Sequence, residues 1–184
     1  MARLGAIETE KLTPRQREVV QKIASGPRAS LGGPFWPWMR SPELADRAQS
    51  LGEFVRFKSS LPPRIFELAV LFTGRTWTAQ FEWHIHADLA LKAGLAAPIV
   101  DAIAANKRPN FDKDDEAAVY DFCAELYATK RVNDARYRSV VRHFGETGVV
   151  ELVGVLGYYA LVSMTLNVFE VPVPPGVQPP LQEV

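Results

Sequence analysis

The fold follows chiefly from residues 64–95, which read RIFELAVLFTGRTWTAQFEWHIHADLALKAGL. Apolar residues recur here at helical spacing, so the segment predicts two helices, 64–76 and 78–94, with a break at Thr76–Thr78. Several ionisable side chains nevertheless lie within these apolar patterns. Because burying a charge is costly unless the charge is paired, these side chains are the candidate site.

The candidate catalytic residues are Glu67 on the first of these helices and Glu82 and His86 on the second. Glu82 and His86 are four residues apart and therefore share one face of a helix. Glu67 can reach them only if the two helices fold back as an antiparallel hairpin. A carboxylate beside an imidazole raises its basicity, so this group could move a proton near neutral pH. In the structural alternative, Glu82 pairs with Arg75 or Lys92, and the imidazole only completes a hydrogen bond in the core.

The pattern does not favour a metal site. Glu67, Glu82 and His86 could supply three ligands, but their order is not HExxH and no second ExxH occurs. His84 lies two residues before His86, about 200° around a helix, so the two imidazoles cannot chelate one ion. We therefore expect neither a metal nor another cofactor.

Composition narrows the class of protein. The chain has 184 residues, with 21 Lys and Arg balanced by 21 Asp and Glu, which argues against a nucleic-acid partner. The only cysteine, Cys123, excludes a disulfide within the chain and favours the cytoplasm. It lacks a CxxC partner and is expected to be a structural thiol. We expect no signal peptide, because the N-terminal residues MARLGAIETEKL contain no long apolar run.

The longest apolar stretch, residues 149–171, contains Glu151 and Asn167. A membrane-spanning helix tolerates such polar groups poorly. We therefore expect a helix of the core or of a subunit interface, and no membrane partner.

Further helices are predicted on both sides of the central pair. Thr13-Pro14 and Ser41-Pro42 each place an N-cap residue before a proline, and they predict helices over 13–24 and 42–57. The remaining predicted helices cover residues 97–106, 114–130, 134–144 and 147–169, and the expected apolar stripe of helix 42–57 is Leu44, Ala48, Leu51 and Phe54/Val55. No strand-like alternation occurs, so the predicted class is all-α, with about seven to eight helices around a central helical hairpin.

The chain divides into three parts by composition. Residues 1–40 hold a helix and an aromatic loop rich in proline and glycine, 41–172 form the helical domain, and 173–184 are a Pro-rich tail. The aromatic side chains of the loop either cover the domain's own core or form part of a ligand pocket or subunit contact. The tail is expected to be an extended arm, either disordered or lying on a partner.

Residues 40–172 resemble the carboxymuconolactone decarboxylase family, which includes the alkyl hydroperoxidase D type proteins. The resemblance depends on PPRIFELAVL, WTAQFEWHIHADLALKAGL, DEAAVYDFCAEL and GVVELVGVLGYYALVSMTLNVFEVPVPPG. It implies an all-helical fold of the alkyl hydroperoxidase D type and a homo-oligomer, either a trimer or a hexamer.

The resemblance also places the chain in one branch of that family. In the hydroperoxidase branch, a glutamate is followed by a CxxC pair and then by a histidine. These four positions fall on Glu67, Ala79, Glu82 and His86, so both cysteines are absent here. Dithiol peroxide chemistry needs an attacking and a resolving sulfur, and the chain therefore looks closer to the decarboxylase-like branch.

The function implied by the resemblance is that of a cofactor-independent lyase or isomerase, like 4-carboxymuconolactone decarboxylase. It would act on a small carboxylated lactone or an acid derived from an aromatic compound. In that reading His86 delivers the proton or hydrogen-bonds the developing anion, Glu82 orients His86 and Glu67 tunes the pair. The expected substrate-binding residues are Arg75, Trp77 and Trp83. The alternatives are an alkylhydroperoxidase or peroxiredoxin-like antioxidant protein and a non-catalytic oligomeric binding protein.

Overall fold

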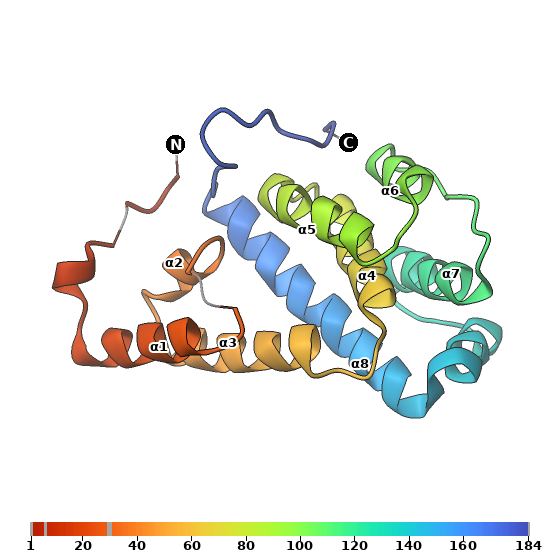
Figure 1. Ribbon diagram of the computed structural model, residues 1–184, viewed down its shortest axis with the longest axis horizontal. Helices are drawn as coiled ribbons and strands as arrows, with labels where there is room; N and C mark the ends of the chain where they lie inside the picture. The colour runs from red at the N-terminus through yellow and green to blue at the C-terminus, as the bar shows by residue number, and fades with distance from the viewer. Residues whose placement is uncertain (1, 6, 29–30, 184) are drawn as a thin grey trace.

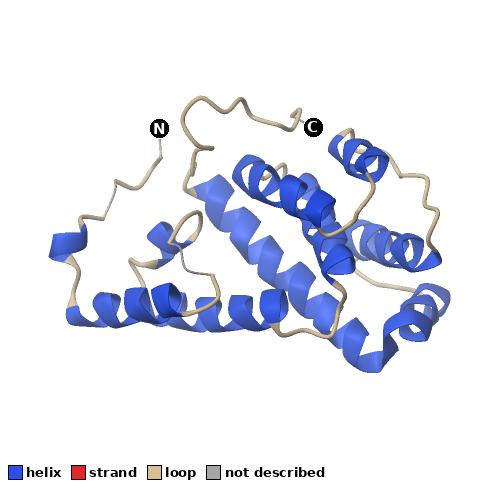
Figure 2. Ribbon diagram, in the orientation of Figure 1, coloured by secondary structure: helices blue, strands red, loops and turns tan. Residues whose placement is uncertain are grey.

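The computed structural model describes residues 2–5, 7–28 and 31–183, and the regular structure within them is entirely helical (Figures 1 and 2). A short 3₁₀ helix, Thr9–Lys11, precedes eight α-helices in this part of the chain. These are α1 (Pro14–Ser25), α2 (Phe35–Trp38), α3 (Pro42–Phe57), α4 (Pro63–Thr76), α5 (Gln80–Lys92), α6 (Ala97–Ala104), α7 (Asp114–Thr129) and α8 (Asp134–Val168). The all-α class and the central pair of helices are thus confirmed.

Helix α4 lies at the centre of the fold. Helices α5, α6, α7 and α8 all pack against it, and Figure 1 shows α5 lying beside the long α8. Most of α4 is buried, including the charged residues Glu67 and Arg75. The apolar sequence of this helix therefore reflects packing on several sides rather than on a single face.

Helix α8 consists of two arms that meet at Gly145. This glycine has φ 68° and ψ 178°, which lie outside the helical region and which glycine adopts at little cost. The break agrees with the predicted helices 134–144 and 147–169. By length and composition α8 could cross a membrane, but 56% of its most apolar window is buried inside the fold. That burial is typical of a core helix in a soluble protein.

The predicted apolar stripe of α3 is wrong for three of its residues. Leu44, Leu51 and Phe54 are between 42% and 46% exposed. The buried residues are instead Ala45, Ala48, Gln49, Gly52 and Val55. Because most of these side chains are small, α3 can pack closely against α1 and α8, and the larger apolar residues are turned outward. The Ser41 hydroxyl, expected to cap α3, makes no capping hydrogen bond.

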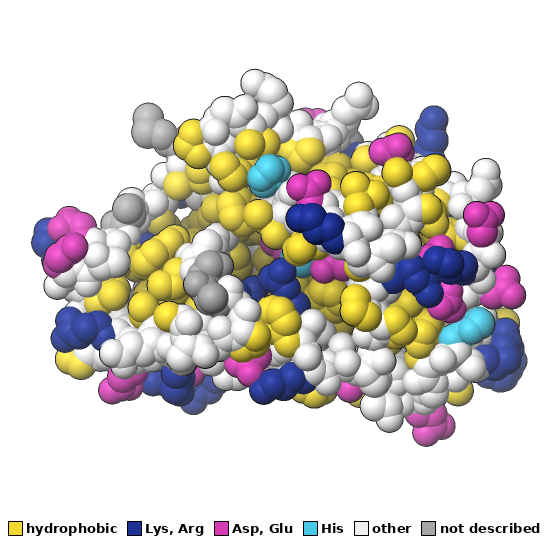
Figure 3. Space-filling model, in the orientation of Figure 1, with side chains coloured by type: hydrophobic (Ala, Val, Ile, Leu, Met, Phe, Trp, Pro, Cys, Tyr) yellow, Lys and Arg dark blue, Asp and Glu magenta, His cyan; other side chains and the backbone are white. Residues whose placement is uncertain are grey.

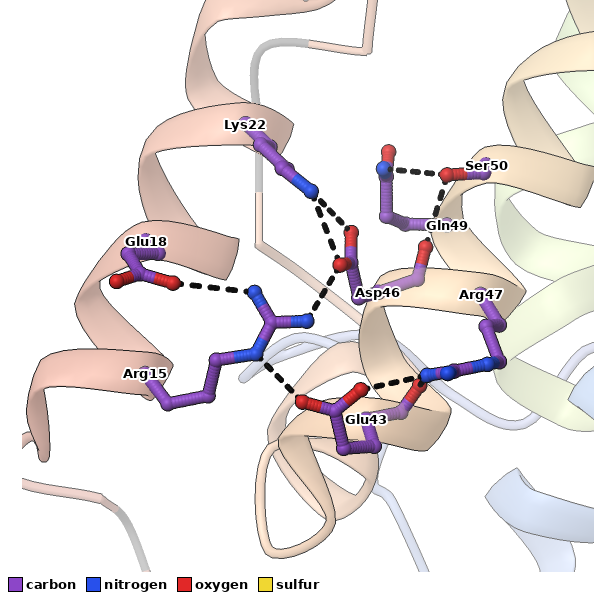
Figure 4. A network of polar contacts seen from close by, with 8 residues as sticks. All are labelled: Arg15, Glu18, Lys22, Glu43, Asp46, Arg47, Gln49 and Ser50. Carbon is purple, nitrogen blue, oxygen red and sulfur yellow. Dashed lines mark hydrogen bonds and ion pairs between the residues drawn. The ribbon is translucent and has the colours of Figure 1, made fainter.

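Ion pairs connect α1 to α3 (Figure 4). Arg15 contacts Glu43 at 2.7 Å and Asp46 at 2.6 Å, and Lys22 contacts Asp46 at 3.0 Å. At its start, α1 has the predicted cap, since the Thr13 side chain accepts a hydrogen bond from the backbone at the third position of the helix. The network fixes α1 against α3.

Helix α2 forms within the segment that the sequence predicts as an aromatic loop. Phe35 and Trp38 are buried in the main core, and Trp38 Nε1 donates a hydrogen bond of 2.9 Å to Thr165 Oγ1 in α8. Trp36 is only partly buried. The interpretation that this segment covers the domain's own core is therefore confirmed for Phe35 and Trp38.

The C-terminal tail is extended, as predicted, and it packs on its own chain. Leu181 is buried, and its backbone exchanges two hydrogen bonds of 2.8 Å with the side chain of Gln80 at the start of α5. Arg75 Nη1 donates a further bond of 3.1 Å to the carbonyl of Gln182. These contacts hold the tail across the turn of the central hairpin.

Candidate functional site

The site is built on the hairpin of α4 and α5. The two helices are joined by Trp77–Ala79, and Thr78 takes the left-handed conformation with φ 47°. The turn is closed by hydrogen bonds from Thr78 N to Arg75 O and from Ala79 N to Gly74 O. This tight reversal places the two helices antiparallel, so that a residue early in α4 lies opposite a residue in the middle of α5.

Glu67, Glu82 and His86 converge in this hairpin. Nδ1 of His86 lies 2.6 Å from Oε2 of Glu67, and Nε2 lies 2.9 Å from Oε1 of Glu82. All three residues are buried, and His86 is only 2% exposed. Both ring nitrogens therefore have a carboxylate partner, which leaves neither of them free to ligate a metal in this arrangement. Of the residues described, no group of three or more His, Cys, Asp or Glu is arranged to hold a metal ion.

The two carboxylates change the protonation of His86. Burial by itself disfavours the charged imidazolium, but attraction to Glu82 and hydrogen bonds to Glu67 and Glu82 outweigh it and raise the pKa of His86 to about 9. The imidazole is therefore protonated at neutral pH and donates a hydrogen bond on each side. A buried group that holds a proton at pH 7 between two acceptors is a suitable proton reservoir.

An aromatic layer covers the other side of the imidazole. The ring of Tyr159 meets it edge-to-face with centroids 5.2 Å apart, and the Phe66 ring lies 6.4 Å away. Tyr159 is itself 2% exposed. This layer keeps water from the charged group, and electrostatic interactions inside it are correspondingly stronger.

A pocket of about 270 Å³ opens beside the group. Its charged lining residues are Arg28, Arg56, Glu82 and His86, and its aromatic lining residues include Phe35, Phe57, Phe81, Tyr158 and Tyr159. Glu67 does not line the pocket and lies behind the imidazole. The face drawn in Figure 3 is hollowed near its centre, where basic, acidic and histidine side chains meet among hydrophobic ones. A pocket of this size and lining suits a small organic acid.

The three residues expected to bind substrate lie outside this pocket. Arg75 is buried at the hairpin turn and bonds to Thr78 and to the tail. Trp77 is 37% exposed and lies beside the tail, and Trp83 is buried in the core. The expectation was based on the charge and position of these residues in the sequence, which cannot show on which side of the hairpin a side chain lies.

Sequence reasoning did not single out Arg28 and Arg56. Arg28 lies in the segment between α1 and α2, and Arg56 lies near the end of α3. The only signal in the sequence was the aromatic loop that follows Arg28, which we considered as part of a ligand pocket. Phe35 of that segment does line the pocket.

The two positions that correspond to cysteines in the hydroperoxidase branch are Ala79, at the start of α5, and Glu82. The only thiol, Cys123, lies on α7, is completely buried and has its pKa raised above the usual range by that burial. A thiol of this kind is a poor nucleophile, because the thiolate is the reactive form.

The fold defined by these helices is that of the alkyl hydroperoxidase D (AhpD) proteins. Two solved structures show the likeness. One is the alkylhydroperoxidase AhpD core of an uncharacterized peroxidase-related protein from Ralstonia eutropha JMP134, with a TM-score of 0.77 and 15% identity over 95% of this chain and 93% of that chain. The other is a protein of unknown function from Agrobacterium tumefaciens, described as an AhpD-type antioxidant defence protein, with a TM-score of 0.66 and 17% identity over 75% of this chain and 95% of that chain.

At such identities the likeness shows the fold alone. No protein-family profile and no curated protein sequence matches the chain. The likeness does not distinguish the carboxymuconolactone decarboxylase branch from the hydroperoxidase branch.

Proposed function

We propose that the protein is a cofactor-independent lyase or isomerase of the carboxymuconolactone decarboxylase kind. It would move a proton to or from a small carboxylated lactone or an acid derived from an aromatic compound. The observation that carries the proposal is the position of His86. This residue is buried between two carboxylates at the edge of a pocket of suitable size. Acid–base chemistry of this kind needs a held proton and an acceptor within hydrogen-bond reach, and the group supplies both.

Glu82 is the member of the group best placed to contact the substrate. Both nitrogens of His86 already bond to carboxylates, whereas Oε2 of Glu82 has no hydrogen bond to the residues described. We therefore assign the proton transfer at the substrate to Glu82, with His86 as the reservoir behind it and Glu67 as the group that holds the imidazole. This assignment exchanges the roles that the resemblance implied for Glu82 and His86.

A decarboxylation by this route needs no cofactor, because the substrate itself takes up the electron pair and the protein supplies the proton. The bond between the carboxylate carbon and the substrate ring breaks, carbon dioxide leaves, and the electron pair stays on the substrate as an enolate. Glu82 passes the proton of His86 Nε2 to the enolate carbon. A proton from water restores His86 after the product leaves. An isomerisation uses the same relay in both directions.

The antioxidant alternative has less support in the residues present. Peroxide reduction by two thiols would require cysteines where the chain has Ala79 and Glu82. Cys123 could not replace them, because it is buried on α7, outside the pocket.

We also propose that the chain forms a homo-oligomer in the cytoplasm. The long second arm of α8 exposes a row of apolar side chains: Val150 (71% exposed), Val153 (49%), Met164 (40%) and Val168 (53%). The exposed positions between Val150 and Val168 carry no charge. Continuous apolar surfaces of this kind mark sites of protein association.

The test of the proposed reaction follows protons directly. The protein is incubated in D₂O with a panel of unsaturated lactone acids and aromatic-derived carboxylic acids, and NMR records loss of carbon dioxide or exchange of carbon-bound hydrogen. We expect turnover or exchange with at least one acid. Binding of panel members without any exchange would favour the non-catalytic alternative and would contradict the proposal.

A further inference from the structure

We propose that Arg28, Arg56 and Tyr158 form an anion-binding subsite that holds the carboxylate of a flat, unsaturated or aromatic monoacid in the pocket. The inference rests on the proposed function, because that function identifies the bound acid as the substrate. It also replaces Arg75, the anchor expected from the sequence, by two arginines from other parts of the chain.

The first observation is an unpaired hydroxyl. Tyr158 is 3% exposed, yet its Oη has no hydrogen-bond partner among the residues described. Burial raises the pKa of Tyr158 to about 12, so the phenol keeps its proton and can act as a donor. Buried polar groups in proteins are nearly always hydrogen-bonded, and an unpaired donor that lines a pocket is explained when a ligand accepts its bond.

The second observation concerns the two arginines. Nη2 of Arg28 is buried and also lacks a partner in the described part of the chain. Its guanidinium stacks on the Phe35 ring at 4.9 Å, and that of Arg56 lies 5.2 Å from the Phe57 ring. Neither is in an ion pair among the described residues, unlike Arg64, which is paired with two carboxylates. Aromatic rings thus orient two guanidinium groups without neutralising them.

Gly52 brings the phenol and one guanidinium together. A Cβ at this position in α3 would lie 2.2 Å from Oη of Tyr158 and 3.0 Å from Nη2 of Arg28. Any side chain there would displace both groups. The two unpaired donors, Oη of Tyr158 and Nη2 of Arg28, therefore lie near the same point. At that point α3 has a glycine, so no side chain of the helix stands between them.

The charges of the pocket favour a monoanion. Arg28, Arg56 and protonated His86 line the pocket with three positive charges and Glu82 with one negative charge. Glu67, behind the imidazole, adds a second negative charge, so one positive charge is left for a ligand to neutralise. An acid bound at the arginines lies in the same pocket as Glu82, the group proposed to exchange a proton with it. The apolar walls include Phe57, which suits a flat unsaturated body.

Titration calorimetry with benzoate and its neutral isostere benzamide tests the subsite. We expect benzoate to bind at least about tenfold more tightly than benzamide, because hydrogen bonds to charged groups are worth this much or more. Arg28→Gln and Arg56→Gln should each weaken benzoate binding by about tenfold or more. The control Arg138→Gln, at a side chain that is 64% exposed, near the start of α8 and outside the pocket, should leave it unchanged. No binding of benzoate to the wild-type protein, or equal binding to the variants, would overturn the proposal.

Tyr158→Phe separates ligand binding from folding. Because the hydroxyl has no partner among the described residues, its removal should leave the thermal unfolding midpoint unchanged or higher. The same substitution should weaken benzoate binding about threefold or more. A lower midpoint with unchanged benzoate affinity would show that the hydroxyl serves the fold, and it would contradict the subsite.

Glu82→Gln distinguishes a failure of the subsite from a failure of the proposed reaction. This variant keeps both arginines and should bind benzoate within a few-fold of the wild-type protein. Arginine-dependent benzoate binding together with full proton exchange in Glu82→Gln would leave the subsite standing and contradict the role proposed for Glu82 in the reaction. Loss of exchange in Glu82→Gln, together with benzoate binding that is unchanged in the two arginine variants, would support the proposed reaction and contradict the subsite.

Discussion

Nε2 of His86 lies 2.9 Å from Oε1 of Glu82, one turn earlier on the same helix. The other imidazole nitrogen is held by Glu67 from the neighbouring helix, at 2.6 Å. The proton of His86 Nε2 can therefore pass to Glu82, whose second oxygen has no partner among the residues described. This geometry leads to the first prediction.

Glu82→Gln should lower the rate of proton exchange with a responsive acid by about 10²–10⁴-fold. Glutamine keeps the size of the side chain and can still accept the hydrogen bond of His86 Nε2, but it cannot carry a proton. The rate is measured by NMR in D₂O, and circular dichroism verifies that the helical content is retained.

His84→Gln is the matched control on the same helix. His84 is partly exposed and does not line the pocket, so its substitution should leave the exchange rate unchanged. If the two variants behaved alike, the assignment of Glu82 as the proton-transfer group would be wrong.

The second prediction concerns stability and pH. The pKa of His86 is about 9 in the folded protein, above the usual value of about 6.5 in an unfolded chain. The folded state therefore holds the proton more tightly, and the resulting stabilisation is complete below pH 6.5 and is lost as the pH rises through 9. We expect the free energy of unfolding to fall by a few kcal/mol over this interval, as measured by urea denaturation. The difference between the wild-type protein and His86→Gln isolates this residue, and a difference that does not vary with pH would contradict the shift.

The third prediction concerns Arg75. Its guanidinium bonds to the carbonyl of Gln182, and its position outside the pocket indicates a role in holding the tail. Arg75→Gln should lower the free energy of unfolding by about 1 kcal/mol, the value of a typical hydrogen bond, and should leave benzoate affinity unchanged. Calorimetric titration measures the affinity, and a tenfold loss would restore Arg75 as the carboxylate anchor.

The fourth prediction concerns assembly. Val153 belongs to the exposed apolar row on α8 and is 49% exposed in the single chain. Val153→Glu places a charge in the proposed interface and should reduce the mass measured by light scattering to that of one chain, because an unpaired charge is costly to bury. Val153→Thr has nearly the same shape without the charge and should remain assembled. Wild-type protein that is already monomeric would refute the homo-oligomer.

Local signals in the sequence were sufficient for the α-helices other than α2, which forms in a segment predicted as a loop. Thr13-Pro14 starts α1 where predicted, and Gly145 divides α8 as predicted, because capping and backbone freedom act over a few residues. The pairing of Glu82 with His86 could also be predicted from the sequence, since residues four apart on a helix must share a face. Only the hairpin had to be inferred, and it brings Glu67 to the same imidazole.

The inner face of α3 and the rest of the pocket depended on contacts between distant segments. The predicted stripe of α3 was wrong for its large residues Leu44, Leu51 and Phe54, because the closest packing is made by small residues such as Gly52. Arg28 and Arg56 become neighbours of Glu82 only when α3 lies against α8 and Arg28 lies beside Gly52 of α3. Helical periodicity thus specifies which residues share a helix face. Which faces meet is set by side-chain volume and shape across the whole core, and that information is not contained in any one segment.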